Sequence, residues 1–382
     1  MNTEKSESTY EYEETGEKPG KKSKKGNIVF FIVVGVIFLI TLAVNIIYTN
    51  SVAFADFFNE RISSGVRAAF ATVTACFPFS LAEFLALTSI LWVILLIRHI
   101  HIIHKDDPKA EFIGIFKALI VVLLTGYTVF VWMFGAGYKT STLDRKMNIE
   151  KKPVSEEELY ETAMLMVDRL NALNSAVTYM PDGSSVRPFS HDECVRLCHA
   201  SYGKLMKEYD FIGKVAAPVK QLVVSDIMTY THISGFYSFL TGEANLNTNY
   251  PYYINVYTTA HEMAHQRGIA REDEANFIAY LVCIHSDDPY MQYSGYLNMY
   301  EYLSSALYEA SPALYGKVYS ALSEDAKGEL RAYAEFFEKY RTNPASDISD
   351  TVNDAYLKSQ GTPGEISYGM VVDLAVAYHK ER

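Results

Sequence analysis

Three long apolar runs dominate the first third of the chain, at residues 28–48, 81–97 and 112–133. A helix rises 1.5 Å per residue, so about 20 residues span the hydrocarbon core of a bilayer. The first run exceeds the roughly 7–15 apolar residues of a signal peptide, and no convincing small-residue cleavage site follows it. We therefore expect three retained transmembrane helices in a membrane region over residues 26–138.

Apolar residues recur at helical spacing over much of the remaining chain, residues 139–382. Ser155 followed by Glu158 is typical of a capping box that starts a helix. Further helices are predicted at about 191–209, 292–309, 312–322, 323–340 and 368–379. Strand signals are few: 221–224, and an edge strand plus loop within 242–255, which Pro251 interrupts. The expected fold is mainly α with a small β-sheet, an α+β domain that follows the membrane region.

Composition and charge narrow the possible partners. The net charge of −11 excludes a nucleic-acid partner, and the four cysteines are too few for a disulfide scaffold. Residues 1–25 mix Glu, Lys, Ser and Gly without apolar periodicity, which predicts a disordered tail. The bilayer itself is the first expected partner.

Basic residues set the expected orientation. Four lysines (Lys21, Lys22, Lys24, Lys25) precede the first apolar run, and Arg98, Lys105 and Lys109 lie between the second and third. The positive-inside rule puts both sites in the cytoplasm. We expect a multi-pass cell-membrane protein with a cytoplasmic N-terminus, a helix along the outer surface over residues 51–80, and an extracytoplasmic domain over 139–382.

The chemistry is concentrated in the sequence His261-Glu262-Met263-Ala264-His265. Histidines at i and i+4 share one helical face, so both imidazoles can bind one Zn²⁺. Glu262 can take a proton from a zinc-activated water. Thr258 or Thr259 is the expected N-cap and Gly268 the residue after the helix.

The third zinc ligand is expected from the acidic first turn of the next helix, Glu272-Asp273-Glu274. Glu272 is preferred, because Asn276 lies one turn further along and could orient its carboxylate from the second coordination shell. Glu274 is the alternative, although its helical neighbours look like a core face.

These two helices resemble zincin metallopeptidases of the glutamate-ligand type, in which HExxH is followed by a helix bearing E-x-x-A-D/N. The resemblance implies a zincin-like domain with His261, His265 and Glu272 as ligands and Glu262 as catalytic base. The chain departs from most of them in the short spacing from His265 to Glu272. It also resembles an uncharacterised bacterial membrane-anchored family in its three spans, the segment Gly242–Asn247, the HExxH motif and the segment Tyr356–Gly361.

Glu243, Asn245 and Asn247 alternate before the motif and could form a strand that pairs with an extended peptide substrate. Three further residues (His232, Tyr293, Tyr296) are candidates for an oxyanion donor. Cys194 and Cys198, with His191 and His199, could form a second metal site, although a helical i, i+4 pair with free thiols is the simpler interpretation.

The expected function is a membrane-anchored zinc metallopeptidase that hydrolyses peptide bonds in a peptide or envelope-protein substrate. Two alternatives stay open: a catalytically inactive zincin-fold sensor or binding module, and a zinc hydrolase acting on a non-peptide envelope substrate.

Overall fold

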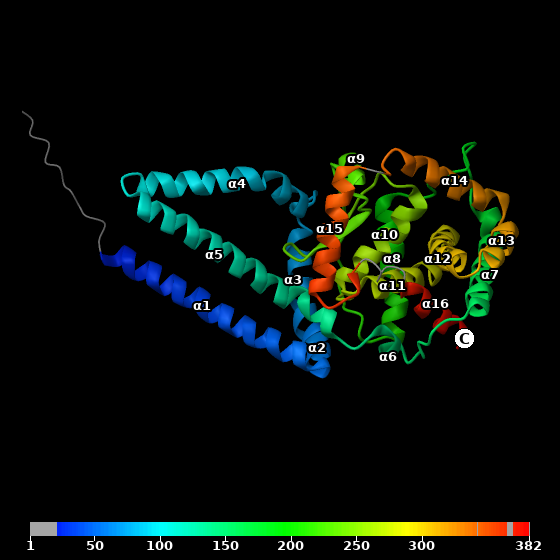
Figure 1. Cartoon of the computed structure of the whole chain (residues 1–382), viewed down its shortest axis with the longest axis horizontal. Helices are drawn as coiled ribbons and strands as arrows, with labels where there is room; N and C mark the ends of the chain where they lie inside the picture. Colours follow the sequence, from blue (N-terminus) through cyan, green and yellow to red (C-terminus); the bar gives the residue numbers. More distant parts are fainter. Residues whose placement is uncertain (1–20, 342, 365–369, 382) are drawn as a thin grey trace, which may run out of the picture.

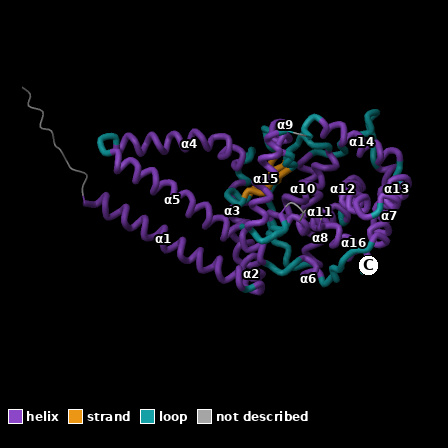
Figure 2. The backbone as a smooth tube through the Cα atoms, viewed as in Figure 1, coloured by secondary structure: helices purple, strands orange, loops and turns teal. Residues whose placement is uncertain are grey.

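The computed structural model describes residues 21–341, 343–364 and 370–381, and no side chain before residue 28. Three long helices extend to one side, and the remaining helices gather around a small sheet on the other (Figures 1 and 2). The chain is therefore mainly helical with one three-stranded sheet among the described residues, as the sequence predicts.

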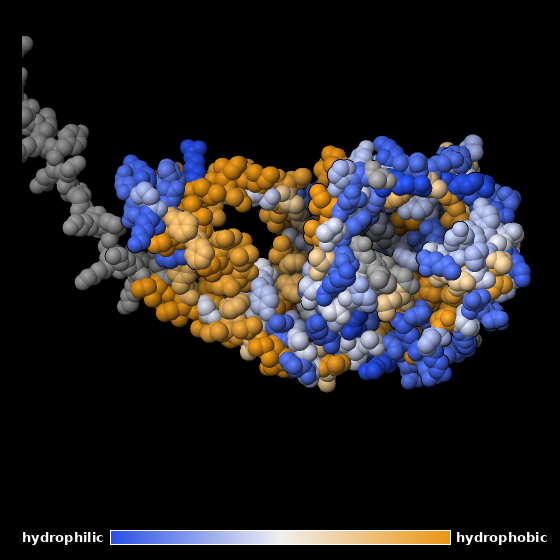
Figure 3. Space-filling model, viewed as in Figure 1, coloured by the Kyte–Doolittle hydropathy of each residue, from blue (hydrophilic) through white to orange (hydrophobic). Residues whose placement is uncertain are grey.

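The three extended helices are α1 (Lys21–Asn50), α4 (Leu81–His104) and α5 (Pro108–Met133). All three are long and apolar enough to cross a membrane. Their side chains form the broad hydrophobic surface in Figure 3. Helix α1 already includes residues 21–25 of the predicted tail, whereas residues 1–20 lie outside the described residues.

Between α1 and α4 the chain forms α2 (Val52–Phe57), the π-helix η1 (Phe58–Ser63) and α3 (Ser64–Thr74). Residues 52–74 of the segment 51–80 are therefore helical, in three consecutive pieces. Arg67 on α3 is buried, and its guanidinium donates to Oδ1 of Asn59 and to the main-chain oxygen of Met133, both at 2.9 Å. The segment is therefore packed into the protein, not merely laid along a membrane surface.

The second part of the molecule contains most of the helices. In chain order they are η2 (Gly135–Lys139), α6 (Leu143–Met147), α7 (Glu156–Leu173), η3 (Asn174–Ala176), α8 (His191–Glu208), α9 (Ser225–Met228), η4 (Thr229–Thr231), α10 (Tyr252–Gln266), α11 (Glu272–Ile284), α12 (Pro289–Ala310), α13 (Pro312–Ala321), α14 (Glu324–Glu338), α15 (Pro344–Ser359) and α16 (Val371–Lys380). The capping box at Ser155 and Glu158 is present and starts α7. Helix α15 was not predicted.

The sheet has the strand order β1-β3-β2, with β1 (Val219–Gln221) parallel and β2 (Gly235–Ser238) antiparallel to β3 (Glu243–Leu246). Val219 pairs with Ala244 and Phe236 with Asn245. The predicted strand at 221–224 therefore lies slightly earlier. The prediction of an edge strand within 242–255 is wrong, because β3 is paired on both sides.

Helices α10 and α11 lie at the centre of the globular core. Val256, Phe277 and Leu281 are fully buried there, together with Leu297 of α12 and Val167 of α7. The burial of so much apolar surface is what holds the two helices in place. Helix α10 begins at Tyr252, after Pro251, so Thr258 and Thr259 lie inside it and neither is its N-cap.

Candidate metal centre

His261 and His265 on α10 meet Glu272 at the start of α11. Nε2 of His261 lies 3.2 Å and Nε2 of His265 3.5 Å from the same carboxylate oxygen, Oε2 of Glu272. One ligand atom from each residue lies within 4.8 Å of the other two. Two imidazoles and one carboxylate that converge in this way could act as three ligands of a zinc ion and leave its fourth coordination position open.

A tight turn joins the two helices and brings Glu272 back to the histidines. Gly268 has a φ of 98°, a left-handed conformation that suits glycine. Beyond it, the main-chain oxygen of Ile269 accepts a hydrogen bond of 2.7 Å from Nδ1 of His265. In the neutral form of the ring, Nδ1 keeps its proton for this bond, so the lone pair is on Nε2, which faces Glu272.

Opposite charges stabilise the cluster. Burial lowers the pKa of His265, but the Glu272 and Glu262 carboxylates and the Ile269 carbonyl together outweigh burial and raise that pKa to about 9. Burial alone would raise the pKa of Glu272, yet the charges and hydrogen bonds of His265 and His261 hold it well below its ordinary value. The pocket thus favours positive charge next to the carboxylate, which a bound cation would also supply.

Glu262 lies beside this cluster. The residue is 3% exposed, and its Oε2 has no hydrogen-bond partner among the described residues. Burial raises its pKa to about 7, against the lowering effect of His261 and His265. Strand β2 approaches closely, since a Cβ on Gly235 would lie 2.9 Å from Cγ of Glu262. A buried carboxyl that titrates near neutrality is suited to general-base chemistry.

The two acidic candidates for the third ligand, Glu272 and Glu274, have different partners. Oε1 of Glu274 accepts hydrogen bonds from the main-chain nitrogen of Leu143 at 2.9 Å and from the Arg271 guanidinium at 2.8 Å. Glu274 therefore anchors the chain before α6, and Glu272 is the carboxylate in the cluster.

Asn276 does not have the role predicted for it. Its Nδ2 has no hydrogen-bond partner, so the amide does not orient Glu272. Its main-chain oxygen accepts a hydrogen bond of 2.6 Å from the hydroxyl of Tyr257.

The proposed substrate strand is also corrected. Glu243, Asn245 and Asn247 are all buried. Glu243 accepts hydrogen bonds from the main-chain nitrogens of Leu81 and Ala82 at 3.1 and 2.9 Å, and so caps the start of α4. Because β3 is paired on both sides, an added peptide could reach only β2 or β1.

The three candidates for an oxyanion donor lie in different places relative to the cavity. His232 lines the same cavity as the metal cluster, but its Nε2 is bound to the main-chain oxygen of Tyr340 at 2.7 Å. Tyr293 and Tyr296 lie outside that lining, which includes the unpredicted Tyr302. Tyr302 lies far from the HExxH motif in the sequence, so no local pattern around the motif indicates it.

Among the described residues, no cysteine belongs to a group that could hold a metal ion. Cys194 and Cys198 are buried free thiols on α8. His191 and His199 bond through Nε2 to main-chain oxygens, of Val219 at 2.8 Å and Ala217 at 3.1 Å.

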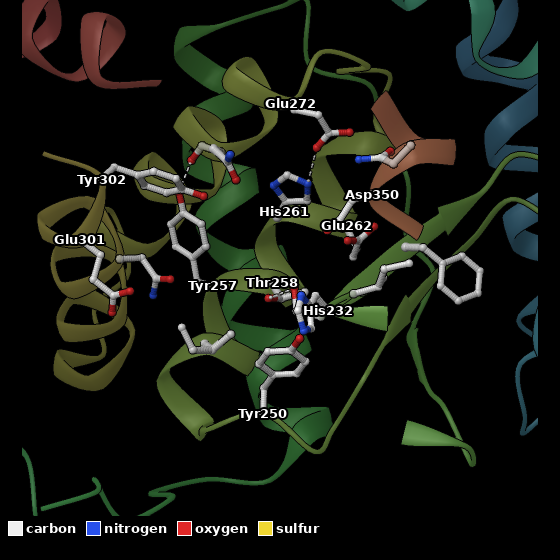
Figure 4. Close-up of a pocket in the computed structure, with 18 of the residues that line it drawn as sticks. His232, Tyr250, Tyr257, Thr258, His261, Glu262, Glu272, Glu301, Tyr302 and Asp350 are labelled. Carbon is white, nitrogen blue, oxygen red and sulfur yellow. Dashed lines mark hydrogen bonds and ion pairs between the residues drawn. The ribbon is translucent and has the colours of Figure 1, made fainter. Parts of the chain in front are cut away.

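The cluster of His261, His265 and Glu272 opens into a cavity of about 1250 Å³. Figure 4 shows its wall around His261, Glu262 and Glu272, with Tyr257 and Tyr302 on one side and Thr258, His232 and Tyr250 below. Strand β2 contributes Gly235, Phe236 and Tyr237, and α15 contributes residues including Asp350. The cavity is large enough for several residues of an extended peptide.

Comparison with known proteins identifies the family. Residues 58–376 match the model of a family described as "Protein of unknown function (DUF3810)". No curated protein and no solved structure matches the chain. Since the match covers well over half of the chain, including α10 and α11, this protein belongs to the DUF3810 family.

Proposed function

We propose that this protein is a membrane-anchored zinc metallopeptidase. The observation that carries the proposal is the convergence of His261, His265 and Glu272 within 4.8 Å, next to the unpartnered Oε2 of buried Glu262. A zinc site needs three neutral or anionic donors in a fixed arrangement, and a hydrolase needs a base beside it.

His261, His265 and Glu272 would hold the ion, and the Ile269 carbonyl would keep the His265 ring in the required tautomer. When bound, zinc lowers the pKa of a water molecule and polarises a substrate carbonyl. Glu262 takes the proton that the attacking water loses and delivers it to the amine leaving group, so the products are a carboxylate and an amine.

A peptide is the favoured substrate because β2 lines the cavity. This strand is paired with β3 on one side only among the described residues, so its other edge has no strand partner, and its residues line the cavity. Main-chain hydrogen bonds from β2 would hold the peptide across the metal centre. The positions of the lysines and arginines favour an extracytoplasmic domain, with substrates in the envelope.

The test uses the full-length protein in detergent, loaded with zinc and then freed of excess metal. We expect one zinc ion per chain and hydrolysis of a broad mixture of quenched fluorescent peptides. Glu262→Gln should keep the zinc and reduce turnover by about 10²–10⁴-fold, the usual contribution of a general base. Glu335→Gln, the same change at an exposed position on α14 outside the cavity, is the control.

Zinc retention with full activity in Glu262→Gln would contradict the catalytic role. Stoichiometric zinc without any hydrolysis in the unaltered protein would favour a sensor or binding module. Absence of zinc would refute the metal centre itself.

A further inference from the structure

The wall of the cavity is predominantly acidic. Six carboxylates line it and, among the described residues, no lysine or arginine does; the acids are Glu262, Glu272, Glu301, Glu309, Asp350 and Asp373. Glu262 and Glu272 belong to the proposed metal centre, where an ion would offset their charge. The other four have no such role, so their charge acts on whatever enters the cavity.

Glu301 on α12 is half-buried, whereas Glu309 and Asp350 are exposed. Its Oε1 accepts a hydrogen bond of 2.7 Å from the hydroxyl of Tyr253, and no lysine or arginine among the described residues forms an ion pair with it. Burial is the main cause that raises the pKa of Glu301 to about 7, and the nearby carboxylate of Glu329 adds to it. A cationic group next to Glu301 would relieve this unfavourable burial of negative charge.

The remaining acids extend the negative surface around the centre. Figure 4 shows Glu301 on one side of His261 and Glu262, with Asp350 from α15 on the other. Glu309 follows Glu301 by two turns of α12, which keeps it on the same side of that helix. Asp373 is partly offset by Lys151, 3.6 Å away.

A second, independent observation indicates that a bound molecule completes this wall. The hydroxyl of Tyr250 and Nδ2 of Asn276 both belong to cavity-lining residues and have no hydrogen-bond partner in the part of the chain that the structure describes. These residues are only 5% and 3% exposed. Buried polar groups are nearly always paired, so both atoms require a partner that a peptide carbonyl or amide could supply.

We propose that the cavity binds a positively charged peptide segment, and that Glu301 receives a lysine or arginine side chain of that segment. This deepens the proposed peptidase function by naming its substrate class and rests on that function. An anionic segment would meet carboxylates on both sides of the centre, at the cost of like-charge repulsion.

The test measures binding, not turnover. Full-length zinc-loaded Glu262→Gln protein in detergent is titrated into fluorescein-labelled peptides of equal length on an alanine–glycine background. The peptides carry lysine, glutamine or glutamate at the same positions. Fluorescence anisotropy should give an affinity for the lysine peptide at least about tenfold higher than for the glutamine peptide, and weakest binding of the glutamate peptide.

Glu301→Gln, introduced into the Glu262→Gln protein, should reduce this lysine preference by about tenfold. The affinity for the glutamine peptide should stay unchanged, which would also show that the cavity is intact. The matched control is Glu335→Gln, an exposed carboxylate outside the cavity, which should leave the preference as it was. Added Asp350→Asn should lower it to a smaller extent, because Asp350 is exposed.

Equal affinities for the three peptides, no binding of the lysine peptide, or a preference that survives Glu301→Gln would overturn the proposal. The zinc content and hydrolysis described above are separate measurements. A lysine preference in a protein without turnover would therefore reject the peptidase and support the charge selectivity of the cavity.

Discussion

Nδ2 of Asn59 donates a hydrogen bond of 3.0 Å to the main-chain oxygen of Gly268, although the two residues are 209 positions apart. Asn59 lies in η1, between the first two apolar helices, and Gly268 lies in the turn after the HExxH helix. Arg67 fixes this asparagine by donating to its Oδ1 and, at 3.0 Å, to its main-chain oxygen. The membrane-proximal helices thus support the turn that positions the proposed zinc ligands.

Asn59→Ala is expected to destabilise the protein by about 2–3 kcal/mol, because the buried Arg67 guanidinium and the Gly268 carbonyl both lose a partner. It should also weaken zinc retention against a chelator by up to about tenfold, since the turn carries the carbonyl that orients His265. Thermal unfolding and zinc release in detergent measure both effects.

The control is Asn50→Ala, which removes an exposed asparagine whose side chain bonds only within its own helix, to the Ile46 carbonyl. Unaltered zinc release in Asn59→Ala would show that the turn holds its shape without η1.

Local patterns in the sequence predicted the features that depend on local geometry. The three apolar helices, the capping box at Ser155 and the pairing of His261 with His265 all follow from spacing along one helix. Glu272 was preferred over Glu274 from helical geometry, and the structure brings Glu272 to the histidines.

The features that failed depend on partners distant in sequence. Glu243 binds the first main-chain amides of α4, which lie 162 and 161 residues away in the sequence. No local pattern indicates these partners, so its alternation with Asn245 and Asn247 suggested a substrate strand instead. Strand β2 has only four residues, and its pairing with β3 follows from tertiary packing, not from a local pattern. Spacing alone predicts that Asn276 orients Glu272, but its Nδ2 is buried without a hydrogen-bond partner among the described residues.

Glu272→Ala should lose zinc, whereas Glu274→Ala should keep it and lose stability instead. The first change removes one of three donors. The second leaves the Leu143 amide without its acceptor and removes one of the acceptors of the Arg271 guanidinium, which keeps the main-chain oxygens of Tyr138 and Thr140, at a cost of about 1–3 kcal/mol. Elemental analysis and thermal unfolding of the two variants separate the roles. Zinc loss in Glu274→Ala alone would mean that α11 is rotated about its axis in the metal-bound protein.

Orientation in the membrane can be tested by cysteine labelling of intact cells. Cys76 is an exposed native cysteine, so Cys76→Ser provides the background. Asp347→Cys on α15 should react with an impermeant maleimide in whole cells, and Asp106→Cys, between α4 and α5, only after lysis. Both expectations follow from the basic residues that flank the apolar helices. The reverse pattern would place the cavity in the cytoplasm.

The stability of the protein should depend on pH through Glu301. Its pKa is about 7 in the folded chain against an ordinary value of 4.5, so the folded state binds this proton more tightly than the unfolded state. The protonated Glu301 carboxyl therefore contributes fully to stability below about pH 4.5. This contribution is lost as the pH rises through 7, where the buried carboxyl must ionise. Glu301→Gln removes the charge and keeps an acceptor for Tyr253, so at pH 8 the free energy of unfolding should rise by about 2 kcal/mol, with allowance for partial exposure. At pH 4.5 the gain should vanish. Denaturant unfolding at the two pH values, without peptide, tests this, and an equal effect at both would show that the Glu301 carboxylate is not destabilised by burial.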